Sequence, residues 1–366
     1  MLMSRTEWLL AAPAFASNSK ADTPLFPFLS RLIRGEDLSE TEAADFFRAL
    51  TDFNANPAQM AGCLVALTAK GETFAELAGM ARVVRQNTIK IRASHKNFID
   101  LAGTGSSPAK TFNVSTAASF VVAGAGLAVA KHTSRAVMSK TGSADVLGHL
   151  GVKVSGEPTT AQTCLNGVGL CFMFAPKFHP DLLRVGDIRR SLGIRSPLNL
   201  LGVLSNPANA PKQVVGAWHS SLVEPLAQAF ALLGTERTWV VHGGDGLDEV
   251  TLDGETLVAE AAGNKVRMFK LAPEDFKLSR GKIDHLRTES PAESAKIIKD
   301  VLSSKRKDEA RSLVVINAAV ALLAAGIAHE PMHAARLAEQ AIDSGQAQNK
   351  LDRLIQTTNK SERMKG

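Results

Sequence analysis

Residues 98–125 read FIDLAGTGSSPAKTFNVSTAASFVVAGA, and this stretch decides the fold of the chain. Residues 98–102 are almost entirely apolar and predict a short buried strand. A turn rich in glycine and serine follows, and residues 115–125 then predict a helix. A strand, a tight turn and a helix in direct succession are typical of an α/β unit, in which the strand joins a sheet and the helix covers it.

The same alternation continues along the chain. Further strands are predicted at 127–130, 168–174 and 238–241, with helical segments between them. This pattern predicts an α/β fold with a mostly parallel central sheet covered by helices. In such folds the ligand lies outside the carboxyl ends of the strands. We therefore expect the loops that follow these strands to meet at one edge of the sheet, although they are far apart in sequence.

The segment before this region is predicted to be a small helical domain without a chemical motif of its own. Residues 23–93 carry apolar residues at helical spacing, and Ser39 with Glu42 and Thr73 with Glu76 form two capping boxes. The expected division of the chain is a flexible N-terminus at 1–22, a helical domain at 23–93, an α/β domain at 94–345 and a basic C-terminal tail at 346–366.

Composition narrows the class of protein. The chain has 366 residues, of which 45% are hydrophobic, which is enough for a large core. Its net charge of +6 fits either a phosphate-handling enzyme or a nucleic-acid binder. Cys63, Cys164 and Cys171 lack the spacing of a zinc site or a disulfide framework.

No apolar run is long enough to span a membrane. Ala14-Phe15-Ala16 is similar to a signal-peptidase site, but the apolar run before it is short and Glu7 interrupts the region. We therefore expect a cytoplasmic protein.

Two turns rich in glycine and hydroxyl groups follow predicted strands. Glycine lets the backbone approach an anion, and the amides of a turn or of a helix N-terminus donate hydrogen bonds to phosphate. The first turn contains Gly103, Thr104, Gly105, Ser106 and Ser107, followed by Thr111, Asn113, Ser115 and Thr116. The second contains Lys131, His132, Thr133 and Ser134, followed by Ser139, Gly142 and Ser143. Two such turns with neighbouring cations indicate two anionic groups on one ligand.

Two further motifs supply cations and carboxylates. Four arginines, any of which can bind a carboxylate in bidentate fashion, precede Gly202: Arg184, Arg189, Arg190 and Arg195. Spacing does not choose among them, and a solvated basic helix face is the alternative. Asp248 and Glu249 lie in a glycine-flanked loop and suit magnesium, which takes one or two carboxylates together with water and substrate phosphates. A solvated acidic loop is the alternative for this pair.

Taken together, these motifs resemble those of the anthranilate phosphoribosyltransferase family. The family pattern contains GTGGD, TxNxST, KHGNR, SxxGSADxLE, HPxxxxVxxxRxxLGxRTxxNxLGPLxNP and DGLDE, which stand here as GTGSS, TFNVST, KHTSR, SKTGSADVLG, HPDLLRVGDIRRSLGIRSPLNLLGVLSNP and DGLDE. The match extends from about residue 25 to about residue 345. The resemblance implies a small helical domain on a larger α/β domain of the nucleoside phosphorylase and phosphoribosyltransferase type, in a homodimer formed through the helical domain.

The resemblance also implies an activity. The enzyme would transfer ribose 5-phosphate from phosphoribosyl pyrophosphate (PRPP) to anthranilate or a similar aromatic acid, in tryptophan biosynthesis, with two Mg²⁺ ions. By position, the donor would contact the two turns together with Asn113 and Lys131. The magnesium ligands would be Ser115, Asp248 and Glu249. The acceptor carboxylate would bind Arg189, which with Lys131 would be catalytic, and the acceptor would lie beside His132, Ser134 and Val203.

The chain departs from the family pattern in these loops. Ser107 stands where the family has aspartate, Ser106 and Pro108 replace glycines, Thr133-Ser134 replaces Gly-Asn, and Val203 replaces proline. These differences leave open a paralogue that uses another aromatic acid, a non-catalytic relative that binds nucleic acid in a basic cleft, and a nucleoside phosphorylase. The KHTSR and DGLDE strings fit phosphorolysis poorly. The retained lysine, serine and acidic pair favour the phosphoribosyltransferase.

Overall fold

The computed structural model describes residues 24–363, apart from 106–108, 110, 135–141 and 155–156. The expected flexible N-terminus and the candidate residues Ser106, Ser107 and Ser139 lie outside this part. The chain forms two compact units. The first contains the described residues up to Asn87 together with His179–Ser205, and the second contains Thr88–Phe178 and the residues from Asn206 onward.

The first unit is helical, as predicted. Its helices are α2 (Phe26–Ile33), α3 (Glu40–Leu50), α4 (Pro57–Lys70), α5 (Phe74–Asn87), α9 (Pro180–Arg184), α10 (Gly186–Leu192) and α11 (Leu198–Leu201). The two expected capping boxes open α3 and α5. Helix α3 buries an apolar face that includes Phe46, Phe47 and Leu50, and it packs against α5.

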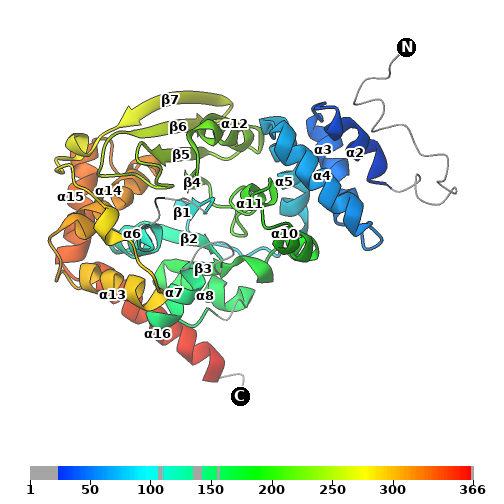
Figure 1. The fold of residues 1–366 in the computed structure, drawn as a ribbon. Coiled ribbons are helices and arrows are strands. Elements are labelled where there is room, and N and C mark those ends of the chain that lie inside the picture. Colours follow the sequence, from blue (N-terminus) through cyan, green and yellow to red (C-terminus); the bar gives the residue numbers. More distant parts are fainter. Residues whose placement is uncertain (1–23, 106–108, 110, 135–141, 155–156, 364–366) are drawn as a thin grey trace, which may run out of the picture. The chain divides into compact units, whose positions relative to one another are not determined.

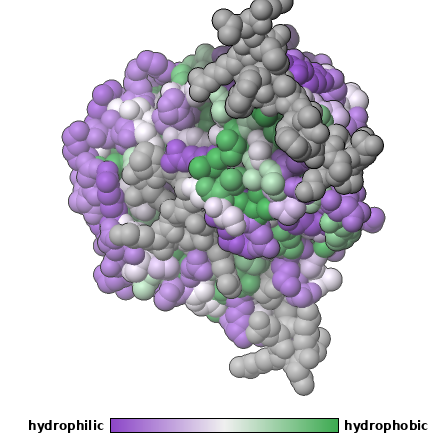
Figure 2. Space-filling model, turned by 45° about the vertical axis from the view of Figure 1, so that its right-hand side comes forward, coloured by the Kyte–Doolittle hydropathy of each residue, from purple (hydrophilic) through white to green (hydrophobic). Residues whose placement is uncertain are grey.

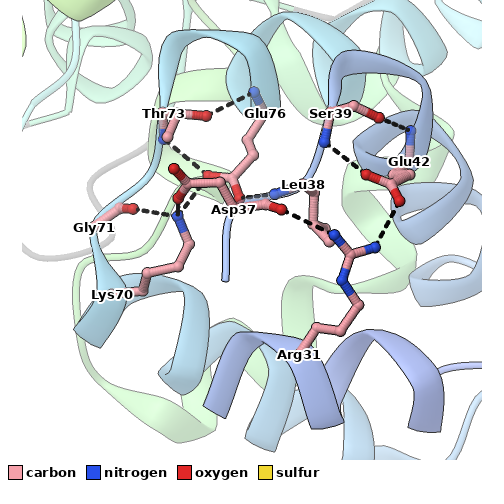
Figure 3. Close-up of polar contacts among 9 residues, drawn as sticks. All are labelled: Arg31, Asp37, Leu38, Ser39, Glu42, Lys70, Gly71, Thr73 and Glu76. Carbon is pink, nitrogen blue, oxygen red and sulfur yellow. Dashed lines mark hydrogen bonds and ion pairs between the residues drawn. The ribbon is translucent and has the colours of Figure 1, made fainter. Parts of the chain in front are cut away.

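A polar cluster links the ends of these helices (Figure 3). The Glu76 carboxylate accepts hydrogen bonds from the backbone amides of Leu38 and Thr73, at 2.9 and 2.8 Å, and from Lys70 Nζ at 3.0 Å. Lys70 also pairs with Asp37 at 2.6 Å. The Lys70 and Glu76 side chains are both buried, and each is paired, so neither leaves an uncompensated charge in the interior.

The division of the chain differs from the expected one between His179 and Ser205. These residues belong to the helical unit rather than to the α/β unit. Helices α9, α10 and α11 pack on α4 and α5, Asn87 Nδ2 donates to Asp181 Oδ2 at 2.7 Å, and Arg85 Nε donates to the Leu204 carbonyl at 2.7 Å. An amphipathic helix pattern shows that a face is buried, but not which part of the chain covers it.

The second unit contains a seven-stranded sheet in the order β3-β2-β1-β4-β5-β6-β7 (Figure 1). Its strands are β1 (Phe98–Gly103), β2 (Ala128–Thr133), β3 (Leu170–Phe174), β4 (Lys212–Gly216), β5 (Arg237–Gly243), β6 (Thr256–Ala262) and β7 (Lys265–Leu271). Strands β1 to β5 are parallel, and β6 and β7 extend the sheet as an antiparallel hairpin. The prediction of a mostly parallel sheet is confirmed.

Helices cover this sheet. They are α6 (Val114–Gly124), α7 (Ser143–His149), α8 (Pro158–Val168), α12 (Val223–Leu232), α13 (Pro291–Leu302), α14 (Glu309–Ala324), α15 (Pro331–Asp343) and α16 (Gln346–Arg363). Four short 3-10 segments complete the elements: η1 (Ala175–Lys177), η2 (Ser220–Leu222), η3 (Pro273–Phe276) and η4 (Asp284–Leu286). Helix α14 is buried along nearly its whole length, which explains its apolar sequence on every face.

The C-terminal segment differs from the separate basic tail expected for it. Residues from Gln346 form α16, which packs on α6 and α8 and buries Leu351 and Leu354. Lys350 Nζ and Arg353 donate to carbonyls in the last turn of α8, each at 2.7 Å. Cations are favourable at a helix C-terminus, so part of the basic character is structural.

The surface is mixed. Figure 2 shows one face of the molecule, on which hydrophilic residues surround a group of hydrophobic ones. Exposed apolar residues of the helical unit include Phe26, Ile33, Val65 and Phe74, on α2, α4 and α5. None of the described helices is both long enough and apolar enough to cross a membrane.

Candidate active site

The loop after β5 returns against the carboxyl ends of β1 and β4. A Cβ atom on Gly103, the last residue of β1, would lie 3.3 Å from Asp248 Oδ2. A Cβ atom on Gly216, the last residue of β4, would lie 1.7 Å from the Asp248 carbonyl oxygen. No residue with a side chain can be accommodated at that distance. Glycine at these strand ends therefore lets the acidic loop approach the sheet edge closely.

A chain of hydrogen bonds connects β2, α6 and the acidic loop. Lys131 Nζ is buried at 3% exposure, donates to Ser115 Oγ at 3.2 Å, and also donates to the Leu101 carbonyl. The Ser115 amide donates to Glu249 Oε1 at 2.8 Å. Ser115 lies in the first turn of α6, where backbone amides have no partner within the helix. The lysine and the acidic pair thus share one site, as the parallel sheet predicts.

The oxygen donors of this site suit magnesium. Asp248 is almost buried and Glu249 is half-buried, and the Ser115 hydroxyl lies beside them. Within the described part of the chain no three His, Cys, Asp or Glu side chains form a metal cluster. Two carboxylates and a hydroxyl nevertheless fit Mg²⁺, because this ion keeps several waters and binds substrate phosphates.

The first glycine turn is held by β4. Thr104 donates through both its amide and its hydroxyl to the Gly216 carbonyl, at 2.8 and 3.0 Å, and its hydroxyl accepts from the Trp218 amide at 3.0 Å. The hydroxyl proton of Thr104 is therefore used within the protein, and a contact of Thr104 with the phosphoribosyl donor stays a prediction. Gly105 has a φ of +70°, which favours glycine.

Three more candidate residues of this region lie at the start of α6 or just before it. Thr111 is buried, and its hydroxyl donates to the Phe112 carbonyl at 3.4 Å. Thr116 is fully buried, and its hydroxyl has no hydrogen-bond partner among the described residues. Asn113 is held by Ser294 of α13, whose hydroxyl donates to Asn113 Oδ1 at 2.9 Å and accepts from the Asn113 amide at 3.0 Å.

The second turn is only partly described. Thr133 and Ser143 are hydrogen-bonded through their hydroxyls, and Ser143 Oγ lies 3.3 Å from the Ser134 carbonyl, in position to donate to it. Gly142 is the N-cap residue of α7. The expected role of the full turn from Ser139 to Ser143 falls partly outside the described residues.

A buried polar pair between β1 and β2 was not expected. Asp100 of β1 is fully buried and accepts hydrogen bonds from the His132 amide, at 3.1 Å, and from Asn206 Nδ2, at 2.7 Å. Burial raises the pKa of Asp100 to about 6, while the charge of Lys131 opposes this shift. Asp100 carries no sequence signal that separates it from an ordinary core polar residue, and Asn206 belongs to the Asn-Pro end of a family motif that does not by itself reveal its role.

The expected acceptor residues Arg189 and Val203 belong to the helical unit and are not among the residues that the α/β unit brings together. Val203 is buried. Arg189 is half-buried, burial lowers its pKa, and its guanidinium has no partner among the described residues. Its neighbours are engaged differently: Arg190 pairs with Asp187, and Arg184 donates to the Thr51 carbonyl at 3.1 Å.

Comparison with known proteins identifies the family. Residues 95–348 match the a/b domain of a glycosyl transferase family, and residues 26–88 match the helical bundle domain of a glycosyl transferase family. An anthranilate phosphoribosyltransferase of Moorella thermoacetica is 45% identical over 327 residues, which cover 89% of this chain and 96% of that protein. The chain belongs to the anthranilate phosphoribosyltransferase family. A member from Desulfosudis oleivorans is 43% identical, over 90% of this chain and 97% of its own length.

Solved structures of anthranilate phosphoribosyltransferases share the fold. The Thermus thermophilus protein superposes with a TM-score of 0.85 at 36% identity, covering 91% of this chain and 99% of that one. The Saccharomyces cerevisiae protein in complex with PRPP and Mg has a TM-score of 0.85 at 27% identity, covering 93% and 99%. These similarities confirm the predicted fold class of a small helical domain and a larger α/β domain.

Proposed function

We propose that this chain transfers the phosphoribosyl group of PRPP to anthranilate, in tryptophan biosynthesis, and releases pyrophosphate. The observation that carries the proposal is the meeting of Lys131, Ser115 and the Asp248–Glu249 pair at one sheet edge. The relatives named above support it, and one of them is in complex with PRPP and Mg. The hypothesis of a nucleic-acid-binding relative finds no support in these similarities.

The protein's contribution to donor chemistry is positioning and electrostatic. The glycine turn and Asn113 bind phosphate through amide groups, and the buried Lys131 ammonium offsets the charge that develops on the leaving pyrophosphate. Ser115, Asp248 and Glu249 hold magnesium, with two ions as the proposed number. Magnesium, when bound, neutralises part of the phosphate charge and orients the phosphates. No protein nucleophile is required.

Arg189 binds the acceptor carboxylate. The half-buried guanidinium has no partner among the residues that the structure describes, and a carboxylate matches its two-pronged geometry. His132, Ser134 and Val203 contact the acceptor in this proposal. Thr133-Ser134 and Val203 depart from the family pattern beside the proposed acceptor, so we expect them to influence which aromatic acids are accepted.

The test is pyrophosphate release from PRPP across a panel of aromatic acids, with and without magnesium. We expect turnover that needs both an acceptor and Mg²⁺, with anthranilate as the best acceptor. Absence of turnover with every acid, together with salt-sensitive DNA binding, would support the nucleic-acid hypothesis instead. A parallel assay with nucleosides and phosphate tests phosphorolysis.

Two variants separate the donor and acceptor roles. Asp248→Asn combined with Glu249→Gln is expected to lower kcat at least about 100-fold without unfolding the protein. Arg189→Ala is expected to raise the KM for anthranilate at least about tenfold with little change in the KM for PRPP. Arg190→Ala is the matched control, since Arg190 is exposed and pairs with Asp187. Equal effects of the two arginine substitutions would contradict the carboxylate assignment.

We further propose that the chain works in the cytoplasm as a homodimer formed through the helical unit. Supporting observations are the exposed apolar residues Phe26, Ile33, Val65 and Phe74 of this unit, and the three free cysteines. Sedimentation velocity of the wild type and of Ile33→Asp with Val65→Asp tests the assembly. A wild-type monomer at micromolar concentration contradicts it.

A further inference from the structure

Strands β1 and β2 lose their backbone pairing toward the catalytic edge of the sheet. β1 is paired with β4 at five positions, and β2 with β3 at five positions. Among the residues of β1 and β2, all of which are described, pairing between these two strands occurs only at Phe98↔Ala128 and Ile99↔Val129. The two strands thus lack ladder pairing along the stretch that carries Lys131.

Side chains satisfy the backbone groups in this gap. Asp100 Oδ1 accepts from the His132 amide at 3.1 Å, and Asn206 Nδ2 donates to the Ala130 carbonyl at 2.9 Å. Asn206 Nδ2 also donates to Asp100 Oδ2 at 2.7 Å. Asp100 and Asn206 therefore form a bridge that replaces the missing ladder bonds between the strands.

The direction of this bridge is determined by Asn206. Its Oδ1 accepts from the amides of Ala208 and Ala210, at 2.8 and 3.4 Å, so its Nδ2 must face the strands. The group that faces Nδ2 has to be a hydrogen-bond acceptor. Both oxygens of a carboxylate accept, so Asp100 can bind Asn206 with one oxygen and the His132 backbone amide with the other. Asp100 is fully buried and Asn206 is 7% exposed, so water does not readily replace either group.

Asp100 also supplies charge. The Lys131 ammonium is buried, and it donates hydrogen bonds to two neutral groups, the Leu101 carbonyl and the Ser115 hydroxyl. Asp100 attracts this ammonium electrostatically through the low-dielectric interior of the sheet. A buried cation is costly without a nearby anion, and Asp100 contributes negative charge without being one of the proposed magnesium ligands.

We propose that Asp100 and Asn206 are positioning residues, which link β1 and β2 across the unpaired stretch and thereby place the Lys131 ammonium for phosphoribosyl transfer. This inference rests on the proposed function, in which Lys131 offsets charge on the leaving pyrophosphate. Its consequence is that the bridge acts through Lys131 on the bound PRPP as well as on the transition state, and has little effect on the acceptor, which Arg189 binds.

The test exchanges the two groups. In Asp100→Asn, either orientation of the new amide brings an NH2 group against a donor, the His132 amide or the Asn206 amide. In Asn206→Asp, two carboxylates face each other. The double variant with both substitutions restores one amide–carboxylate hydrogen bond and keeps one negative charge near Lys131. Glu260→Gln is the control, because Glu260 is also buried in the sheet but bonds Trp239, Arg237 and Arg267 on its far side.

We expect each single variant to lower kcat at saturating PRPP and anthranilate at least about tenfold, as misplacement of a catalytic group does. The KM for anthranilate should stay within about twofold of wild type, because the acceptor carboxylate binds elsewhere. The double variant should regain at least about threefold in kcat over the better single variant, as coupled neighbours do. Glu260→Gln should lower the unfolding temperature and leave kcat unchanged.

A purely structural role predicts lower unfolding temperatures with wild-type kcat, and that result overturns the inference, as does a double variant no better than its worse parent. If Asp100→Asn does not fold, Asn206→Ser removes the bridging NH2 group and leaves a hydroxyl that can still accept from the Ala208 backbone amide. A wild-type kcat in that variant also overturns the inference. A wild-type protein without turnover refutes the proposed function instead. The inference is then judged by calorimetric binding of PRPP with Mg²⁺, where an unchanged Kd in Asp100→Asn overturns it.

Discussion

Gly216 shows how the candidate metal site depends on the absence of a side chain. A methyl group at this position would overlap the Asp248 carbonyl, at 1.7 Å, and would push the acidic loop away from the strand ends. We expect Gly216→Ala to lower kcat about 100-fold, since displacement by an ångström costs that much in an organised site, and to raise the magnesium concentration needed for half-maximal rate. Magnesium titrations of the rate check this, and a wild-type magnesium response would show that the loop tolerates displacement.

Ser294 acts on the donor site through Asn113. The Ser294 hydroxyl accepts from the Asn113 backbone amide and donates its proton to the side-chain oxygen, Asn113 Oδ1. The side-chain NH2 group of Asn113 therefore faces away from α13. Ser294→Ala removes this constraint, and we expect the KM for PRPP to rise about tenfold, the cost of one well-placed hydrogen bond to a charged group. The KM for anthranilate should not change.

A double-mutant cycle with Asn113→Ala isolates this pathway. If Ser294 acts only by orienting Asn113, the double variant has the same KM for PRPP as Asn113→Ala alone. Additive losses would mean that Ser294 affects the donor site by another route, for example through the start of α6.

At the scale of the elements, the close contact between α3 and α5 decides whether a glycine-to-alanine substitution raises or lowers stability. Glycine to alanine inside a helix normally stabilises it by about 1 kcal/mol. A Cβ atom on Gly79 of α5 would lie 2.1 Å from the Glu40 carbonyl oxygen of α3, so the two helices would have to move apart. Overpacking of this kind destabilises the folded state by about 1–3 kcal/mol. We therefore expect Gly79→Ala to destabilise the helical unit. Gly167→Ala in α8, where no atom lies within 4 Å, is the matched control and should be neutral or stabilising.

Hydrogen exchange followed by mass spectrometry measures this effect, because it resolves α3 and α5 separately from α8. Faster exchange in α3 and α5 of Gly79→Ala, with no change in the control, is the expected pattern. Equal protection in both variants would show that α3 and α5 can separate at no cost.

The elements themselves were largely predictable, and their partners were not. The strand at 98–102 and the helix at 115–125 appear within one residue of the expected bounds, because apolar runs and glycine turns are local signals. Strands β4, β6 and β7 carry no motif and were not predicted individually. The segment 179–205 and the C-terminal helix α16 pack on surfaces that no local pattern reveals.

In the candidate site, too, some features could be predicted from the sequence and others could not. The convergence of Lys131 and the acidic pair follows from parallel strands, whose carboxyl ends share one edge. The Asp100–Asn206 and Asn113–Ser294 contacts join residues more than 100 positions apart in sequence, and each residue taken alone is a common polar side chain. Such pairs become visible only when the fold brings them together.

At the scale of the whole molecule, the two units can be followed separately during unfolding. The chain has three tryptophans: Trp218 and Trp239 lie in the α/β unit, and Trp8 lies outside the described residues. The described part of the helical unit contains none, so tryptophan fluorescence reports mainly on the unit that contains Asp100. The effect of Asp100 ionisation on the unfolding free energy can therefore be measured by tryptophan fluorescence.

The pH dependence of that unfolding has a definite sign. Burial raises the pKa of Asp100 from 3.8 to about 6, so the folded protein binds this proton more tightly than the unfolded chain does. The stabilisation of the folded protein by protonated Asp100 is complete below about pH 4 and is lost as the pH rises through about 6. Asp100→Asn cannot ionise. We therefore expect the wild type to lose up to about 3 kcal/mol of unfolding free energy relative to this variant between pH 4 and pH 7.

Urea unfolding of both proteins at several pH values measures this difference. Groups present in both proteins cancel, including His179, whose pKa burial lowers to about 4, and paired acids such as Asp308. A difference that stays constant from pH 4 to pH 7 would mean that Lys131 already stabilises the ionised form of Asp100 fully in the folded state. The carboxylate would then be a permanent partner of the lysine, and the raised pKa assigned to Asp100 would be wrong.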